Sequence, residues 1–515
     1  MTHSSRRNVR HKKGDLAELL TRLDLGSSIA ESDNLLEIAR VETSVFTDLL
    51  ADRVDLIPGT KGSGKSALYR IFVDFMPRYL AEQRKIVVAH GVQSHGDSVF
   101  HAFRERFDQL SEPDFVDFWC IYLISLAHEH FIKNPDYAHL LADSTKEVEA
   151  FKRACYVARI PEIRAKKTLK EVLEWALDAL ASRFKPKLSI NAQTQETSLT
   201  LFDYLPQPAP EPTVVNLPNF VSSIRQALDA VLVKADLHLW LMVDRLDEVF
   251  PRRSATETKA LRGLLRTLAI LSSPRIRVKI FLRDDILAQI SEGPEGFTGL
   301  THITARQANR LKWSEDQILT LVVKRLSASD ELREYLAIDL DRLNANRRYQ
   351  EQVFYQVFPQ TVHSGPNQSS TLGWIYTHTQ DGRNVVTPRD VIDLLTRAKQ
   401  QQQDEFRADP TGDAEWIIGP AAIRYGHSEL STRKKDTYLR AEFPHFWPHI
   451  EKFIKGKTEY SESAIKRLLG RQSEAIVDDL LSIGLLTETK TKESRWFKIP
   501  FLYRDGLELT QGKAE

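Results

Sequence analysis

The stretch VDLIPGTKGSGKSAL, residues 54–68, decides the interpretation of this chain. Its first residues, Val54 to Ile57, are apolar and predict a strand, and from Ala67 onward the pattern ALYRIFVDFMPRYL has the period of an amphipathic helix. Between them, residues 59–66 match G-x-x-x-x-G-K-[S/T] in every fixed position. We interpret the stretch as a phosphate-binding loop between a strand and a helix; the alternative is an ordinary glycine turn.

Each residue type in this loop has a chemical role toward phosphate. Glycines let backbone N–H groups converge on phosphate oxygens, and the following helix points its positive end at them. Lys65 is expected to reach the β- and γ-phosphates, and the Ser66 hydroxyl is expected to join the shell of a Mg²⁺ ion. The predicted nucleotide-binding residues of the loop are Gly59, Thr60, Lys61, Gly62, Ser63, Gly64, Lys65, Ser66 and Ala67.

A second apolar run, HLWLMV at residues 238–243, predicts a strand that is covered on both faces and lies beside the first strand. Asp244 ends this strand and is the predicted metal-side carboxylate. Asp247 and Glu248 follow at positions from which they could polarise an attacking water, with Glu248 as the general base. The alternative is a buried strand followed by a solvated acidic turn.

Arg283 follows the next predicted parallel strand, RVKIFL at residues 277–282. The carboxyl edge of such a sheet is where ligands bind, so we expect Arg283 to sense the γ-phosphate. The competing interpretation is an ion pair with Asp284 or Asp285.

Three further arginines are candidates for contacts with nucleotide. HITA and NRLKW, within residues 302–313, predict the edge of the same sheet. Arg306 and Arg310 lie by the last apolar run, NRLKW, from which an arginine could reach a neighbouring subunit. Thr387 and Pro388 predict the start of a helix, with Arg389 in its first turn; Arg389 is assigned to nucleotide binding from a lid. Surface exposure or a structural salt bridge is the alternative for each.

Composition limits the class of protein. The 515 residues hold 71 basic and 70 acidic side chains, which argues against binding nucleic acid by bulk charge. The two cysteines, Cys120 and Cys155, are too few for a disulfide framework, so a reducing, cytoplasmic location is expected. The apolar run at residues 118–128 is shorter than the roughly 20 residues of a membrane span, so we predict no membrane contact.

The domain organisation follows from these patterns. We predict an α/β fold, with an arm and helix at residues 1–42 and a parallel-sheet core at 43–330. An insertion at about 98–219 contains a candidate hairpin and a proline-rich connector. At the end of the core, Ser314 with Asp316 and Gln317 after it predicts a capped helix at 314–326. A helical lid at 331–430 and a further domain at 431–515 complete the chain.

The last domain resembles a winged helix, since three predicted helices precede a β-wing. Its predicted wing carries four cations that could grip phosphates, and its predicted recognition helix carries Asp478 and Asp479. The four cations are Lys490, Lys492, Arg495 and Lys498. Contact with DNA and contact with a protein are the two alternatives for this domain.

Taken in order, the GTKGSGKSAL loop, the DRLDE strand end, Arg283 and the TPRDVIDLL helix resemble the AAA+ and signal-transduction (STAND) P-loop ATPases. The C-terminal module resembles that of their origin-recognition-like branch. The resemblance implies a five-stranded parallel sheet, ATP and Mg²⁺ as ligands, and self-association or control of a protein effector, with anti-phage defence as a context. The implied function is an ATP-hydrolysing switch; the alternatives are a nucleotide-gated DNA-binding protein and a non-hydrolysing ATP-bound scaffold.

Overall fold

The computed structural model of the chain has a mixed α/β fold and divides into two compact units. It describes residues 11–91, 107–157, 187–190, 197–200, 217–246, 254–291, 297, 300–471, 473–490 and 495–514. Unit 1 comprises Met1–Thr43, Gly62–Gly64 and Lys312–Glu515. Unit 2 comprises Ser44–Lys61 and Lys65–Leu311.

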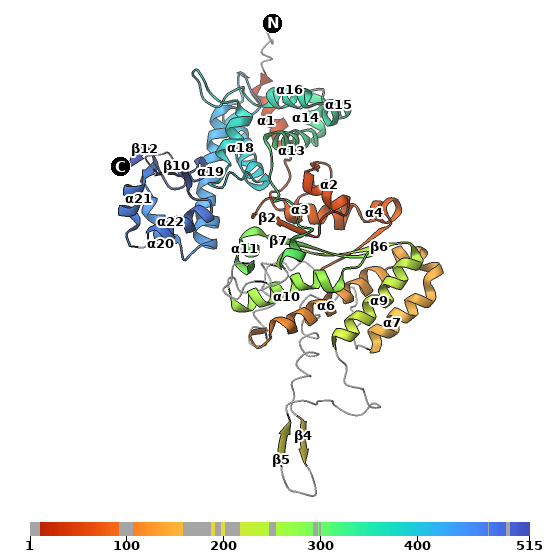
Figure 1. Cartoon of the computed structure of the whole chain (residues 1–515). Coiled ribbons are helices and arrows are strands. Elements are labelled where there is room, and N and C mark those ends of the chain that lie inside the picture. Colours follow the sequence, from red (N-terminus) through yellow and green to blue (C-terminus); the bar gives the residue numbers. More distant parts are fainter. Residues whose placement is uncertain are drawn as a thin grey trace. The chain divides into compact units, whose positions relative to one another are not determined.

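A four-stranded parallel sheet forms the centre of unit 2, in the order β2-β7-β6-β3 (Figure 1). The strands are β2 (Leu56–Gly59), β3 (Ile86–His90), β6 (His238–Val243) and β7 (Ile276–Arg283). Nearly every strand residue is buried, because helices cover both faces of the sheet. The predicted strands at 238–243 and 277–282 are therefore confirmed.

The strand order corrects one prediction. The acidic strand β6 does not lie beside β2, because β7 pairs with both and separates them. Lys279 of β7 donates to Asp55, which directly precedes β2, at 2.7 Å. This ion pair favours β7 as the neighbour of β2. The apolar runs of β6 and β7 are similar, so they do not predict which of the two strands pairs with β2.

Helices pack against the sheet of unit 2. Figure 1 shows α2, α3 and α4 on one face and α6, α7, α9 and α10 on the other. The Trp119 indole of α6 donates to the carbonyl of Ala260 in α10 at 2.8 Å, inside the core that the sheet shares. The helices are α2 (Ser44–Leu50), α3 (Lys65–Arg70), η2 (Ile71–Phe75), α4 (Pro77–Arg84), α6 (Glu112–Ala127), η4 (His128–Ile132), η5 (Pro135–Ser144), α7 (Thr145–Val157), α9 (Leu217–Ala235), α10 (Ala255–Leu271), α11 (Asp284–Ser291) and α12 (Leu300–Thr304).

Residues 300–311 depart from the predicted edge strand. HITA lies largely in the short helix α12, so the prediction of a strand there is wrong. The following segment does run along β2: Gln307 forms an isolated parallel bridge with Leu56, and the Ala308 N–H donates to the Leu56 carbonyl at 2.8 Å. Among the described residues this segment forms one isolated bridge with β2, so it is an irregular edge and not a fifth strand.

Two other segments of unit 2 bear on earlier predictions. The strands β4 (Lys187–Ile190) and β5 (Thr197–Thr200) pair antiparallel, as the hairpin prediction requires. Among the described residues, one helical stretch, Glu112–Ile132, has the length and apolar composition of a membrane span. The protein interior buries 78% of its apolar window, as is usual for a core helix.

Unit 1 contains a helical part and a small mixed part. Side-chain caps start two of its long helices as predicted: Ser314 caps α13 with a capping box that includes Gln317, and Thr387 caps α18 with Pro388 in the first turn. The helical part consists of α1 (Lys13–Arg22), η1 (Ala30–Ser32), α13 (Glu315–Ser327), α14 (Asp330–Tyr335), α15 (Leu340–Ala345), α16 (Arg347–Val357), α17 (Thr371–His378), α18 (Pro388–Ala408), α19 (Pro420–Lys434) and η7 (Lys435–Arg440), with a short pairing of β1 (His11–Lys12) and β8 (Asp413–Ala414).

The C-terminal part of unit 1 has a four-stranded sheet in the order β10-β11-β9-β12. The predicted pair is present as antiparallel β10 (Thr487–Lys490) and β11 (Arg495–Lys498). Two strands that were not predicted, β9 (Lys457–Ser461) and β12 (Thr510–Ala514), extend it. The helices here are α20 (Trp447–Ile450), η8 (Glu451–Phe453), α21 (Glu462–Leu469), α22 (Ser473–Ser482) and α23 (Phe501–Arg504).

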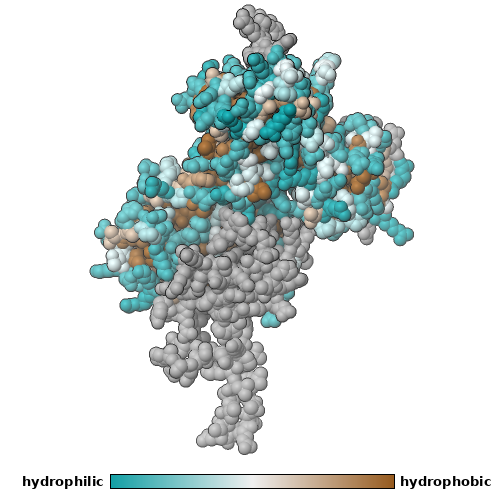
Figure 2. Space-filling model, turned by 180° about the vertical axis from the view of Figure 1, so that it is seen from behind, coloured by the Kyte–Doolittle hydropathy of each residue, from teal (hydrophilic) through white to brown (hydrophobic). Residues whose placement is uncertain are grey.

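The described surface is mostly hydrophilic on the face shown in Figure 2, where apolar residues form small separate spots. Scattered apolar residues of this kind are normal on a protein surface.

Candidate functional site

The glycine-rich loop, residues 59–66, follows the carboxyl end of β2 and leads into α3. Gly62 and Gly64 have φ angles of 82° and 99°, a backbone conformation that side chains disfavour. The Lys65 ammonium donates to the carbonyls of Gly59 at 2.7 Å and Thr60 at 2.9 Å, and Lys65 is only 9% exposed. The loop thus closes on its own lysine and holds a buried positive charge.

Two hydroxyl groups in this loop are buried without a partner. Within the described part of the chain, neither Thr60 Oγ1 nor Ser63 Oγ has a hydrogen-bond partner, although Ser63 is fully buried. A buried hydroxyl without a hydrogen bond costs about 1–3 kcal/mol. Polar groups left in this way beside a buried lysine fit a site that receives a ligand rich in acceptor oxygens.

Arg283 lies next to the loop, because it is the register partner of Gly59 across the β2–β7 pair. Arg283 is 8% exposed, and its guanidinium makes a bidentate pair with Asp285, at 3.0 and 2.7 Å. Burial favours a raised pKa for Asp285, but the hydrogen bonds and charge of Arg283, with a contribution from Lys65, outweigh it and lower that pKa. The structure thus brings Lys65, Arg283 and Asp285 together at one sheet edge.

Asp244 directly follows β6 at the same edge of the sheet. Burial, and after it the charge of Asp244, raise the pKa of Tyr69 well above its usual value. Ser66 stands three residues before Tyr69, on the same side of the helix. Arg245, next along the chain, has a φ of 59°, so the backbone turns sharply after Asp244.

The other two acidic residues of the prediction, Asp247 and Glu248, lie outside the described residues, so their roles stay predictions. Within the described ranges, no group of three or more His, Cys, Asp or Glu side chains could hold a metal ion. The predicted Mg²⁺ residues, Ser66 and Asp244, would supply one hydroxyl and one carboxylate, and a Mg²⁺ ion held by few protein groups keeps waters and phosphate oxygens as its other ligands.

Arg389 lies against the glycine-rich loop within unit 1. A Cβ atom placed on Gly62 would stand 3.2 Å from Thr387 Oγ1 and 3.3 Å from the Cβ of Arg389. The Trp313 indole of the same unit donates to the Ser63 carbonyl at 2.8 Å. Sequence patterns did not identify Trp313, because an isolated tryptophan before a capped helix carries no signal of the loop it contacts.

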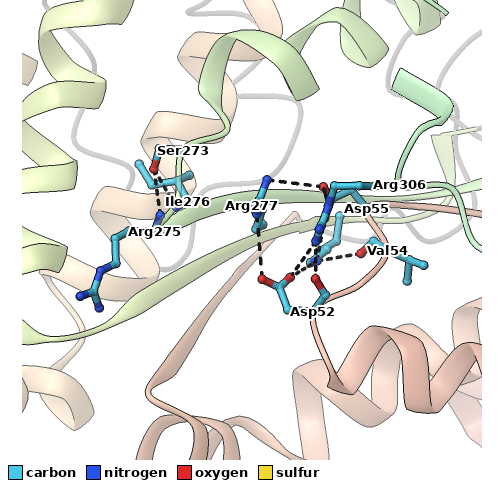
Figure 3. Close-up of polar contacts among 9 residues, drawn as sticks. Asp52, Val54, Asp55, Ser273, Arg275, Ile276, Arg277 and Arg306 are labelled. Atoms are coloured by element: carbon cyan, nitrogen blue, oxygen red, sulfur yellow. Dashed lines mark hydrogen bonds and ion pairs between the residues drawn. The ribbon is translucent and has the colours of Figure 1, made fainter. Parts of the chain in front are cut away.

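Arg306 has a structural role at the amino end of β2, away from the loop. Figure 3 shows Asp52 and Asp55 facing Arg277 and Arg306 from neighbouring segments. Arg306 Nε donates to Asp55 at 2.6 Å, and the fully buried Lys279 also pairs with both aspartates.

Arg310 differs from Arg306 in its exposure and in its position. Its side chain is 66% exposed and lies 3.9 Å from Asp284, at the carboxyl end of β7. Of the two candidates for contact with a neighbouring subunit, Arg310 therefore has the more suitable position.

The cations predicted to grip DNA are paired with carboxylates in the described C-terminal part. Arg495 and Lys490 both pair with Glu488, and Lys498 pairs with Glu459 at 3.2 Å. Lys492 lies outside the described residues. The exposed side of α22 carries Glu474, Asp478 and Asp479, a charge that phosphates repel.

Comparison of the sequence with known protein families and with curated proteins found no match.

Proposed function

We propose that this chain is an ATP-binding and ATP-hydrolysing switch, with a P-loop core of the AAA+ or STAND type. One observation carries the proposal: a glycine-rich loop at the carboxyl end of a parallel strand closes on the buried Lys65 and contains two unpartnered hydroxyls. A flexible glycine turn has no need to bury a lysine. A triphosphate would satisfy the lysine, the hydroxyls and the loop N–H groups at once.

In this proposal Lys65 exchanges its two carbonyl partners for the β- and γ-phosphate oxygens. The exchange is favourable because a charged oxygen is a stronger acceptor for an ammonium than a neutral carbonyl. Arg283 makes a similar exchange between Asp285 and the γ-phosphate, and the lowered pKa of Asp285 keeps this counter-ion charged while no nucleotide is bound.

Ser66 and Asp244 are the residues proposed to hold Mg²⁺, and Glu248 is the proposed general base, with Asp247 beside it. When bound, the metal ion neutralises charge on the β- and γ-phosphates. After burial, the charge of Asp244 contributes to the raised pKa of Tyr69, and Ser66 lies one helical turn before Tyr69, which supports their assignment to one site. Arg389 is the proposed lid contact, supported by its position against Gly62.

The proposed output is a change in self-association or in binding of a protein effector, in the cytoplasm and, by family resemblance, in anti-phage defence. A winged helix that nucleotide releases onto DNA is the weaker alternative, because the three described wing cations are paired with glutamates. A scaffold that binds ATP without hydrolysing it is the other alternative.

Sizing and phosphate release test these proposals together. Wild type, Lys65→Ala and Glu248→Gln are compared with ADP or ATP, with and without duplex DNA, and Arg78→Ala serves as a control because Arg78 is exposed on α4 away from the loop. A switch requires that ATP change the size of the wild type and of Arg78→Ala but not of Lys65→Ala. An unchanged size and unchanged DNA binding in every variant would contradict the switch.

A further inference from the structure

A segment with little regular structure, residues 23–40, follows α1 in unit 1; we call it the strap. Its only helical turn is η1. Several of its apolar side chains are buried, including Leu25, Leu35 and Leu36, so the strap packs on the unit as a defined layer. The backbone bonds within the strap use carbonyls between Ile29 and Glu37, so the carbonyls nearer its two ends are left to other groups.

Four cationic side chains satisfy carbonyls of the strap. They come from α13 and α18, and each donates to a different backbone oxygen. The bonds are Lys399 to Leu23 at 2.9 Å, Arg325 to Leu25 at 2.6 Å, Arg389 to Ser28 at 3.3 Å and Lys324 to Arg40 at 2.8 Å. The position of the strap thus depends on where these four side chains are held.

Arg389 differs from the other three cations. Arg325 is fixed by a buried ion pair with Asp33 at 2.5 Å, in addition to its bond to the strap. Arg389 has the longest of the four bonds, and its side chain passes Gly62 in the glycine-rich loop. It is the only one of the four that the proposed function also assigns to nucleotide.

We infer that Arg389 is shared between the strap and the nucleotide, so that ATP binding frees the turn around Ser28. The inference rests on the proposed function and adds a mechanism for its regulation. A charged phosphate oxygen competes with a neutral carbonyl for the guanidinium, and the charge-assisted bond is the stronger one. Asp33 keeps its bond to Arg325 throughout, so the release is confined to the turn at residues 26–32.

Hydrogen exchange of the whole protein tests this inference, because the turn contains amides with defined bonds. The Ile29 N–H donates to Ser27 Oγ at 3.0 Å, and the Ser32 N–H donates to the Ile29 carbonyl at 3.1 Å. In the absence of nucleotide, Arg389→Ala should speed exchange of these amides by about tenfold, the effect of losing one charged hydrogen bond. Arg397→Ala is the matched control, because Arg397 lies on the same helix and bonds only Gln400 among the described contacts.

Nucleotide supplies the second arm of the experiment. Adding Mg²⁺ and ATP to the wild type should speed exchange at residues 26–32, and adding them to Arg389→Ala should give no further increase. Arg389→Gln repeats both arms in case the alanine variant misfolds. If a fluorescent ATP analogue binds while exchange in the turn stays constant or slows, the inference is overturned and the proposed function stands. If no nucleotide binds at all, both are overturned.

Discussion

The buried ion cluster at the amino end of β2 provides a quantitative test of what stabilises the parallel sheet. Asp55 has a side chain only 7% exposed and accepts hydrogen bonds from Lys279 at 2.7 Å and from Arg306 at 2.6 Å. Asp55→Asn removes the charge while it keeps the shape. Lys279, which is fully buried, then retains only Asp52 as a charged partner.

The expected cost follows from the burial of Lys279. Breaking a buried ion pair by removing one partner costs about 3–5 kcal/mol, because the other charge stays buried. Removing both charges costs much less, so Lys279→Met in the Asp55→Asn background should recover about 2 kcal/mol. Asp48→Asn is the control: Asp48 pairs with an exposed Arg53, and the loss of such a pair costs at most about 1 kcal/mol.

Hydrogen exchange of the β7 amides measures these effects locally, which avoids treating a two-unit chain as a two-state system. The Ile280 N–H donates to the Asp55 carbonyl at 2.8 Å and is a direct reporter. Asp55→Asn should speed its exchange by more than roughly 100-fold, which corresponds to the cost of about 3–5 kcal/mol, and the double variant should slow exchange again by about 30-fold, which corresponds to the recovery of about 2 kcal/mol. If the cost of the double variant equals the sum of the costs of Asp55→Asn alone and Lys279→Met alone, Lys279 and Asp55 are not coupled and the reasoning is refuted.

Three further outcomes are expected. First, burial, followed by the nearby His427, lowers the pKa of His378 to about 3, so this imidazole is neutral when folded and takes up a proton on unfolding between about pH 6.5 and 3. The contribution of His378 to the free energy of unfolding is therefore fully present above about pH 6.5 and is lost as the pH falls through this range. In urea titrations at several pH values, His378→Phe should reduce the number of protons taken up on unfolding in this range by up to one. Second, Gly426→Ala should destabilise unit 1 by more than about 1 kcal/mol in thermal unfolding, because the new methyl would lie 2.4 Å from the Leu394 carbonyl oxygen. Gly412→Ala, also in unit 1, is the comparison: open space surrounds Gly412 and its φ is 84°, so this variant measures the cost of backbone strain without a steric clash. Third, neutralising Lys490 and Arg495 should leave DNA retention in a gel-shift assay unchanged, because Glu488 already pairs with both; a clear loss of retention would revive the DNA-binding alternative.

Local sequence patterns predicted the helices and strands whose conformation is set by neighbouring residues. The apolar runs at β6 and β7 and the capped starts of α13 and α18 all depend on neighbouring residues, and the structure has them where expected. Segments with weak patterns were harder: HITA alternates for too few residues to distinguish a strand from α12, and β9 and β12 are short strands whose pairing decides their conformation.

The sequence predicted the glycine-rich loop of the candidate site but not which residues lie around that loop. Residues 59–66 carry their own signature, whereas the position of Arg283 opposite Gly59 depends on which strand neighbours β2. The contact of Arg389 with Ser28 joins residues far apart in the chain, and no spacing rule reveals it. Long-range pairings of this kind need the folded structure.

The most direct test of the central claim is calorimetric titration of Mg²⁺ and ATP into the wild type, Lys65→Ala and Arg78→Ala. Lys65 holds a buried charge at the loop, and the loss of its hydrogen bonds to phosphate should weaken binding by at least about tenfold. The account predicts saturable binding with one site per chain in the wild type and in Arg78→Ala, and strongly weakened binding in Lys65→Ala. Equal affinity in all three proteins, or no binding heat in the wild type, would contradict it.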